Sequence, residues 1–547
     1  MFSSNRIIGS ILFLSVSASL PGCGGGGGSS TPGVSSTSPA DAATAVARDS
    51  VVTASFDRDI FATTVDGNSF TLAKNGGSTS GSVSFDGATN IASFTPSSPL
   101  YLLTSYTATL TTDITDLNGT PLASSYAWRF TTRDGTWGTP ELVETNDTGD
   151  ATSASMAFEA NGNVMAVWIQ YDGVYDSVWA NRYIVGSGWG TPELIESDIS
   201  GGAHLPKVVV DASGNALAVW HMSDGIRDNV WSNRFEVGTG WGTPELVETN
   251  DAGSAYIRDL EIDPNGNAIA VWSQYNGTWN DSWANRYVPG TGWGVAEIID
   301  IEINDAYVTD LDIDADGNAL AVMMTNDVYG QHIKATRYVP GSGWSTPELL
   351  ETDNAGDAWL PRVSMDSSGH AIAVWHQDDG MHSNIYANRY TVGTGWGARE
   401  LIETDDAEDA TYPGVAVDSE GNALVTWTQN DGVRNNTWVN RYEVGTGWGA
   451  QALLETNNLG NASSARVAFD ANGNAMAVWR QSDGFRNNIW AKRFLAETGW
   501  GAPELIETDD TGSAGSVSVS IGPDGSALAL WNQNDGANSN IMANWFK

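Results

Sequence analysis

The chain has 547 residues and a formal net charge of -41, with 66 Asp and Glu against 25 Lys and Arg. This acidic excess argues against a nucleic-acid-binding protein, because such proteins neutralise phosphates with Lys and Arg. It is typical of a well-solvated surface and leaves divalent cations open as ligands. The length allows more than one domain, and the single Cys excludes a disulfide within the chain.

The first 22 residues have the composition of an export signal. A short polar start precedes an apolar stretch from 7 to 20, and the segment ends Leu20-Pro21-Gly22-Cys23. This ending resembles the Leu-x-Gly-Cys signal of bacterial lipoproteins. The resemblance implies a signal peptide over 1–22, lipidation of Cys23 and a membrane anchor. The expected location is the bacterial outer membrane or cell surface.

Two segments precede the long carboxy-terminal region. Residues 23–37, rich in Gly, Ser and Pro, are expected to form a flexible tether because they cannot bury a core. From 38 to 133, alternating strands separated by turn residues predict a β-sandwich. The ordered motifs resemble the SbsA-type bacterial Ig-like domain, which implies a spacer without catalytic residues. These motifs are Val51–Phe56, Ser69–Leu72, Phe94–Pro96, Tyr106–Leu110, Ile114–Gly119 and Trp128–Thr132.

Residues 134–547 consist of eight near-copies of a 52-residue unit. A turn Trp marks each copy, at Trp137, Trp189, Trp241, Trp293, Trp344, Trp396, Trp448 and Trp500. Each copy contains four short strand patterns, with D-x-x-G-N as the turn after the first. No window shows a sustained apolar period of 3.6 residues, so helices are not expected. Four strands in a repeat of this length predict a propeller blade.

The ends of the repeat region favour a closed ring. The first copy supplies only a fourth strand, at 136–145, and the last copy stops after its third strand, at 540–547. Pairing the two would complete the eighth blade and remove both exposed sheet edges. The sequence therefore predicts an all-β protein, an Ig-like sandwich followed by an eight-bladed β-propeller. The segment V-x-V-D-x-x-G-N-A also resembles the NHL repeat, which implies a blade hairpin.

Recurring columns are interpreted as scaffold. Twenty of the 24 Trp fall in three columns and are expected in blade cores. A third-strand Arg recurs in seven copies, from Arg182 to Arg493, with Trp545 in the eighth. A Glu of the E-L-I-E strand is its expected partner, in a ladder of ion pairs.

Departures from the repeat gather in blades two to five. Aligned at the innermost strand, four consecutive copies carry a ring side chain, and charged residues follow at the third and fifth positions after it. Aromatic faces beside carboxylates and cations are what a glycan or a cationic ligand requires. The alternative is that the charges neutralise one another between blades and the rings only pack. The candidate ligand-binding residues are His204, Tyr256, Tyr307, Trp359, Lys207, Asp259, Glu261, Asp310, Asp312 and Arg362.

No metal or catalytic motif is matched in full. Asp312-x-Asp314-x-Asp316-Gly317 opens like a calcium loop, but Leu320 and Met323 stand at the later ligand positions. His370, His376 and His382 are six residues apart, and a loop precedes the third, which disfavours zinc. No cofactor is expected, with calcium left open.

The principal interpretation is a lipid-anchored, monomeric, non-enzymatic propeller that binds a glycan or protein ligand. One alternative is a polysaccharide-active hydrolase or lyase, in which Glu261 and Asp312 supply acid/base chemistry. Another is a calcium-stabilised adhesion or structural protein. The partners expected are a membrane, through Cys23, and a glycan or protein, but no nucleic acid.

Overall fold

The computed structural model describes residues 31–547, apart from 75, 146–148, 197–200, 251, 302, 329, 352–355, 405–407, 457–458 and 509–510. The expected signal peptide, Cys23 and the start of the tether lie outside these residues. The chain forms two compact units, one of Met1–Leu100 with Thr104–Thr132 and one of Tyr101–Leu103 with Arg133–Lys547. Within the described part, no helix has the length and apolar character needed to cross a membrane.

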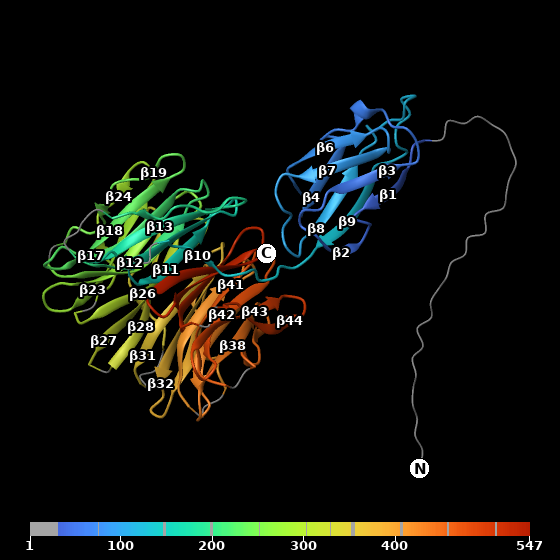
Figure 1. Ribbon diagram of the computed structural model, residues 1–547. Coiled ribbons are helices and arrows are strands. Elements are labelled where there is room, and N and C mark those ends of the chain that lie inside the picture. Colours follow the sequence, from blue (N-terminus) through green and yellow to red (C-terminus); the bar gives the residue numbers. More distant parts are fainter. Residues whose placement is uncertain are drawn as a thin grey trace, which may run out of the picture. The chain divides into compact units, whose positions relative to one another are not determined.

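The first unit is an Ig-like sandwich of two sheets (Figure 1). Inward side chains such as Phe70, Tyr106 and Trp128 are almost fully buried between them, as the period-2 pattern predicts. One sheet has the order β1 (Val34–Ser38), β3 (Val52–Phe56), β7 (Ile91–Pro96), β6 (Gly81–Asp86). The other has the order β2 (Ala43–Val46), β9 (Tyr126–Thr132), β8 (Ser105–Leu110), β4 (Phe70–Lys74), β5 (Gly77–Ser78); η1 (Ala62–Thr64) is a short 3-10 turn.

Strand β1 lies largely inside the segment that was expected to be a flexible tether. Its residues pair with β3, Thr37 opposite Ala54 and Ser38 opposite Thr53. Val34 packs against the sandwich core. The sheet edge thus orders a segment that composition alone predicts to be unstructured, because pairing supplies the backbone partners that the isolated segment lacks.

The second unit is the eight-bladed propeller, and its described residues form eight four-stranded antiparallel blades around a ring (Figure 1). We number the blades from the innermost strand onward in chain order. The innermost strands are β11 (Ala151–Phe158), β16 (Ala203–Val210), β21 (Ala255–Ile262), β26 (Ala306–Ile313), β31 (Ala358–Met365), β36 (Ala410–Val417), β41 (Ala462–Phe469) and β45 (Ala514–Ile521).

The second and third strands of each blade form long hairpins. The second strands are β12 (Val164–Tyr171), β17 (Ala216–Ser223), β22 (Ala268–Tyr275), β27 (Ala319–Asp327), β32 (Ala371–Asp378), β37 (Ala423–Asn430), β42 (Ala475–Ser482) and β46 (Ala527–Asn534). The third strands are β13 (Asp176–Ile184), β18 (Asp228–Glu236), β23 (Asn280–Val288), β28 (Gly330–Val339), β33 (Ser383–Thr391), β38 (Asn435–Glu443), β43 (Asn487–Leu495) and β47 (Ser539–Phe546).

The outer strand of blades one to six is split into two short segments that both pair with the third strand. These segments are β14 (Gly188–Trp189) and β15 (Glu193–Leu194), β19 (Gly240–Trp241) and β20 (Glu245–Leu246), β24 (Gly292–Trp293) and β25 (Glu297–Ile298), β29 (Gly343–Trp344) and β30 (Glu348–Leu349), β34 (Gly395–Trp396) and β35 (Glu400–Leu401), and β39 (Gly447–Trp448) and β40 (Ala452–Leu453). Blade seven ends with β44 (Gly499–Leu505) and blade eight with β10 (Glu141–Leu142).

The ring closes as the sequence predicts. Strand β10 pairs with β47, Glu141 opposite Ala543 and Leu142 opposite Met542. Thr136 and Lys547 exchange two backbone hydrogen bonds, of 3.0 and 3.1 Å. Strand β11 of blade one also contacts β45 to β47 of blade eight. Closure satisfies the two terminal edges, so neither needs a separate cap.

The second-strand Trp column lies in the blade cores. Trp272 has no exposed surface, and its indole Nε1 donates a 3.1 Å hydrogen bond to Oε1 of Gln274, two residues further on. The same Trp-x-Gln contact recurs at Trp168, Trp375, Trp427, Trp479 and Trp531. In blade two Met222 replaces the Gln, and Nε1 of Trp220 has no partner among the described residues. The Gln satisfies the polar atom that burial would otherwise leave unpaired.

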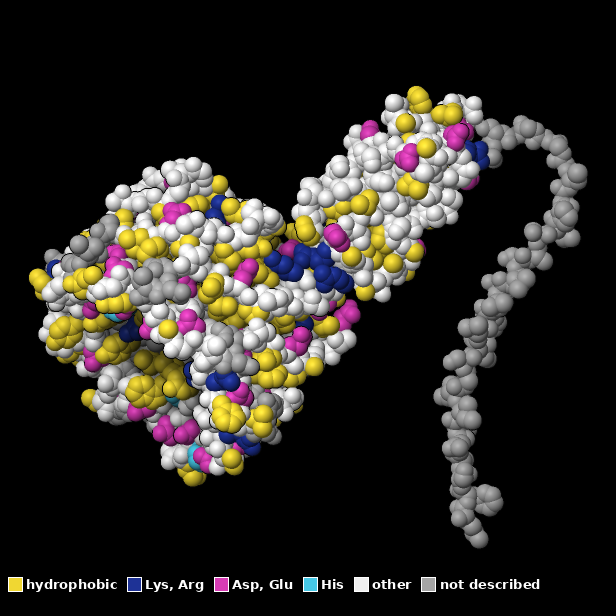
Figure 2. Space-filling model, in the orientation of Figure 1, with side chains coloured by type: hydrophobic (Ala, Val, Ile, Leu, Met, Phe, Trp, Pro, Cys, Tyr) yellow, Lys and Arg dark blue, Asp and Glu magenta, His cyan; other side chains and the backbone are white. Residues whose placement is uncertain are grey.

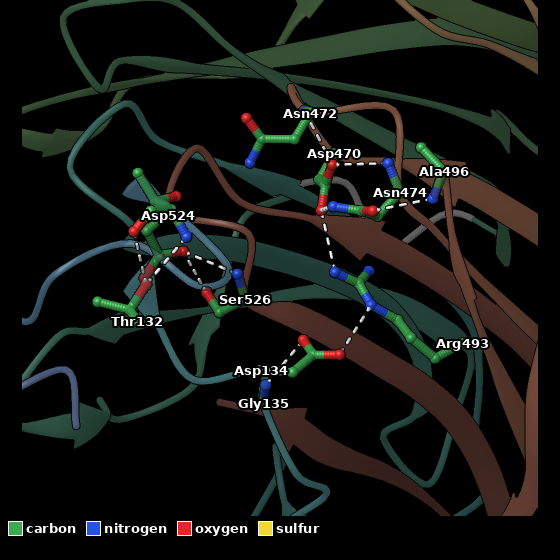
Figure 3. Close-up of polar contacts among 11 residues, drawn as sticks. Thr132, Asp134, Gly135, Asp470, Asn472, Asn474, Arg493, Ala496, Asp524 and Ser526 are labelled. Atoms are coloured by element: carbon green, nitrogen blue, oxygen red, sulfur yellow. Dashed lines mark hydrogen bonds and ion pairs between the residues drawn. The ribbon is translucent and has the colours of Figure 1, made fainter. Parts of the chain in front are cut away.

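The third-strand Arg column differs from expectation. In blades one, two and seven its partner is the acid that opens the first turn, rather than a Glu of the outer strand: Arg493 contacts Asp470 at 3.0 Å, and Arg234 contacts Asp211 at 3.3 Å. Figure 3 shows Asp470 also accepting bonds from the turn amides of Asn472 and Asn474. Six of the seven guanidinium groups also lie over a ring of the next blade, at 5.2 Å for Arg234 and Tyr287. The ion pair therefore holds the Arg within its own blade, and the cation–π contact joins it to the next blade.

The exposed surface reflects the acidic composition. Figure 2 shows Asp and Glu side chains scattered among hydrophobic and uncharged ones, while Lys and Arg occupy few places on the visible face. A surface of this kind repels polyanions at long range. Any anion-binding site must therefore be built locally.

Candidate functional site

Each innermost strand has one edge paired within its blade, and its other edge borders the central channel. Side chains of the preceding blade supply partners for backbone N–H groups on that edge. Oγ of Ser155 accepts a 3.3 Å bond from the N–H of Val208, and Asp259 accepts a 3.2 Å bond from that of Leu311. The same contact joins Asp310 to Val363, Asp312 to Met365 and Ser364 to Val417. Ser or Asp at these positions thus secures one blade to the next.

Four of the candidate charged residues stand three positions after the predicted ring side chains of the innermost strands. They form two ion pairs between neighbouring blades. Nζ of Lys207 lies 3.0 Å from Asp259, and Arg362 lies 3.0 Å from Asp310. The carboxylates raise the pKa of both cations, against the effect of burial. Burial raises the pKa of Asp310 to about 6, although Arg362 opposes the shift. The structure thus shows mutual neutralisation of these four groups.

Glu261 and Asp312 lie two positions further along the innermost strands of blades three and four, and both are acids rather than an acid and a cation. Both are half-buried. Burial raises the pKa of Asp312 to about 7, against hydrogen bonds from the N–H groups of Met365 and Ile313. The pKa of Glu261 is raised well above its ordinary value by burial, and next by Asp312 and Asp259. A carboxyl group held protonated in this way has the acidity that a general acid needs near neutral pH.

Glu261 also differs from its neighbours in its bonding. No described residue forms a hydrogen bond or an ion pair with its carboxyl group, whereas both carboxyl oxygens of Asp312 accept backbone bonds. A structural reason for a carboxyl group at this position is therefore lacking. An unpaired acid kept in a half-buried site is a candidate for a functional role.

A cavity of about 420 Å³ adjoins Lys207 on the channel side of blades eight, one and two. It is lined largely by small side chains, among them Ser155, Ser516 and Ser518. Charged side chains occupy these columns in blades two to five, so the small residues leave the space open. The volume lies within the range of ligand pockets, roughly 300–1,000 Å³.

The four predicted ring side chains lie on the innermost strands, and second-strand histidines extend them. His204 is opposite His221, and Trp359 is opposite His376. The rings of His204 and His221 are 5.5 Å apart, and His221 meets Tyr256 edge-on at 5.3 Å. Burial lowers the pKa of His221 to about 3, helped by His204 and Arg258, so its ring is neutral at pH 7. Tyr256 and Trp359 are each 36% exposed and available for stacking.

Tyr307 is less free than the other three rings. Its hydroxyl accepts a 2.9 Å bond from Nδ2 of Asn280, which also donates to Asp305 at 3.1 Å. Burial raises the pKa of Tyr307, and Asp305 adds to the shift. Tyr307 is therefore held in place by its own blade and the preceding one.

Sequence reasoning missed the bulge residues of the innermost strands, which occupy two neighbouring positions of the repeat. Strand pairing is interrupted between His204 and Lys207 and between Ile257 and Asp259. The bulge brings in Arg258 and Leu205, the latter 46% exposed with a φ of 49°. The equivalent residue in blade six, Tyr412, is 64% exposed, has a φ of 55° and lines a cavity of about 680 Å³. Positive φ at non-Gly residues, repeated around one rim, is the kind of strain found at functional sites.

The histidines and the calcium-loop residues that were considered as metal ligands do not come together in one site. His370 contacts Asp366 at 3.2 Å, and His382 contacts Asp409 at 3.7 Å. Both carboxyl oxygens of Asp314 accept bonds within their own turn, from Asp316 and Asn318. Across the described part of the chain, no group of three or more His, Cys, Asp or Glu is arranged to hold a metal ion.

Comparisons with known proteins bear on both units. The bacterial Ig-like domain family matches residues 28–132, in agreement with the sandwich. A comparison with curated protein sequences gave no match. Similar solved structures include an ulvan lyase, described as a new family of polysaccharide lyase and bound to -[GlcA(1-4)Rha3S]-. It is 10% identical, with a TM-score of 0.43, over 68% of this chain and 95% of the other.

Two further similar structures are an α-L-arabinofuranosidase of Fusarium graminearum and a leech intramolecular trans-sialidase. The first is 13% identical with a TM-score of 0.34, over 53% of this chain and 92% of the other. The second is 10% identical with a TM-score of 0.36, over 88% and 91%. These three proteins are glycan-active enzymes. On this finding we correct the interpretation of a non-enzymatic module, and with it the expectation that the protein is not an enzyme. The likeness itself concerns the fold.

Proposed function

We propose that the protein is a polysaccharide-active enzyme, a hydrolase or a lyase, whose reaction takes place in the central channel beside blades two to five. The observation that carries the proposal is Glu261, a half-buried carboxyl group with a strongly raised pKa and no bonding partner among the described residues. Asp312 and the Lys207–Asp259 pair provide the electrostatic field that acts on it.

Glu261 is the general acid in this proposal. In hydrolysis a water molecule supplies the hydroxyl group of one fragment, and in elimination a base, for which Asp312 is the candidate, removes a ring proton from it. Both reactions break the bond to the bridging oxygen of a glycan, and that oxygen must take up a proton. Protonated Glu261 supplies it and becomes a carboxylate. Lys207 lies in the same electrostatic environment and stabilises the negative charge that then develops.

Binding involves the channel rim and the adjoining cavity. The exposed rings of Tyr256 and Trp359 provide apolar faces for pyranose stacking. The cavity of about 420 Å³ beside Lys207 has room for a sugar unit next to the charged residues. Stacking at the rim would orient the polymer, and the charged groups would act on the linkage inserted into the channel.

The test is turnover by the full chain on a panel of neutral and acidic polysaccharides. Release of reducing ends reports either reaction, and ultraviolet absorbance of an unsaturated product identifies elimination. Glu261→Gln keeps the shape of the side chain and removes its proton donor, so we expect a loss of at least about 100-fold in kcat. The matched control is Glu297→Gln, an exposed Glu on β25. Equal turnover by the wild type and Glu261→Gln would overturn the assignment.

We also propose that the protein is anchored through lipidated Cys23 at the outer membrane or cell surface. Bacterial Ig-like domains of the matched family occur in surface proteins, which supports an extracytoplasmic location. The Leu20-Pro21-Gly22-Cys23 motif supports the lipid anchor. Expression of the full chain in a Gram-negative host with labelled palmitate should label the wild type but not Cys23→Ser. Equal labelling of the two would exclude this anchor.

A further inference from the structure

Arg258 is a channel cation to which the described residues supply no carboxylate partner. Arg258 is the bulge residue of β21, between Ile257 and Asp259. Its Nε is buried without a hydrogen-bond partner. No described residue forms an ion pair with its guanidinium group. Burying a charge without a partner is unfavourable, so a retained Arg of this kind needs an explanation.

The surroundings of Arg258 supply rings rather than carboxylates. Tyr256 and Tyr307 are the neighbours that favour its charged form, and burial is the larger influence and lowers its pKa. His221, on β17 of the preceding blade, is neutral at pH 7 because burial lowers its pKa, helped by His204 and by the charge on Arg258. The guanidinium therefore lies at the rim beside stacking side chains and keeps its hydrogen-bonding capacity unused.

Other channel cations differ from Arg258 in this respect. Lys207 and Arg362 each have a carboxylate at 3.0 Å. Arg466 donates a 3.0 Å bond to the carbonyl oxygen of Ala465, and the charge of Asp310 favours its ionised form. For Arg258 no described carboxylate opposes the effect of burial, which lowers its pKa. Its uncompensated charge suits an external anion.

We infer that Arg258 forms a subsite for an anionic substituent, a carboxylate or a sulfate, on a glycan whose rings stack on Tyr256 and the neighbouring rim. A planar guanidinium binds either group through two parallel hydrogen bonds. The inference rests on the proposed function and names its substrate class as acidic polysaccharides. The net acidic surface, on which Asp and Glu outnumber Lys and Arg, repels polyanions at long range, so binding of an anionic glycan depends on local cations (Figure 2).

The experiment separates binding from turnover. Full-length Glu261→Gln protein is the background, so that polymers stay intact, and affinity electrophoresis measures binding to polygalacturonate, dextran sulfate and uncharged dextran. We expect binding to at least one of the two polyanions and at least tenfold weaker binding to uncharged dextran. Polygalacturonate and dextran sulfate distinguish a carboxylate ligand from a sulfate ligand.

Arg258→Gln should weaken the polyanion binding at least tenfold, and Arg258→Lys should recover part of it. The control is Arg129→Gln, which removes the same charge from an exposed position on β9 and should leave binding unchanged. Equal polyanion binding with and without Arg258, or no preference over uncharged dextran, would overturn the inference. Arg258-dependent binding by a protein that turns over no polymer would instead overturn only the enzymatic proposal.

Discussion

Asp312→Asn should make the propeller less sensitive to pH between 5 and 8. In the folded protein the pKa of Asp312 is about 7, against 3.8 for the free side chain. At pH 5 the unfolded chain is ionised at this position while the folded chain is still protonated. Stability is therefore greatest at low pH and declines as the pH rises to about 7. Asp312→Asn lacks this pH-dependent loss of stability, because Asn does not titrate.

The magnitude follows from the shift. Each pKa unit corresponds to about 1.36 kcal/mol, so the two units between pH 5 and pH 7 amount to about 3 kcal/mol. The propeller unit spans 133–547, and an unfolding entropy of about 2.1 cal/mol/K per residue converts this into about 3 °C of melting temperature. Neutralising Asp312 also relieves Glu261, which adds to the effect in the same direction.

The assay is thermal unfolding of wild type and variant at pH 5 and pH 8. The change in melting temperature between the two pH values is compared for the two proteins. The lost acceptor for the N–H of Met365 lowers stability equally at both pH values and cancels. Ser155→Ala is the matched control, because it removes the equivalent bond to Val208 without removing a titrating group. If Asp312→Asn changed the melting temperature relative to the wild type by the same amount at both pH values, the reasoning would be refuted.

Three other predictions concern the scaffold. Trp272→Ala should destabilise the propeller by about 3–5 kcal/mol in guanidinium unfolding, because the side chain is fully buried; a loss below about 1 kcal/mol would contradict its core position. Arg234→Met should cost about 2 kcal/mol in the same assay, because it removes both the contact with Asp211 and that with the Tyr287 ring. An unchanged midpoint would show that the column contributes little. Millimolar calcium should leave the melting temperature unchanged, because the oxygens of Asp314 are engaged in their own turn; a rise of several degrees would support the calcium-stabilised alternative.

Much of the fold was predictable because it is encoded locally and repeated. Strand alternation, the D-x-x-G-N turn and the spacing of the turn Trp identify a blade without reference to any distant residue. The unmatched outer strand at 136–145 implied closure with the final strand, and pairing of β10 with β47 confirms it. The repeat also aligned Glu261 with Asp312, because equal spacing places equivalent residues at equivalent depth in adjacent blades.

Side-chain contacts within and between blades were decided only by the tertiary structure. The acid that pairs with Arg234 is Asp211 of the first turn, a choice that depends on how the blade twists. Arg258 and Tyr412 reach the rim because bulges shift the alternation of the innermost strands, and alternation alone assigns them to the wrong face. The raised pKa of Glu261 likewise arises from burial in the channel and, next, from the charge of Asp312 on the following blade. The repeat therefore determined the blades and their order, whereas packing around the channel determined which side chains meet and which charges stay unpaired, because burial and bonding depend on distance in space.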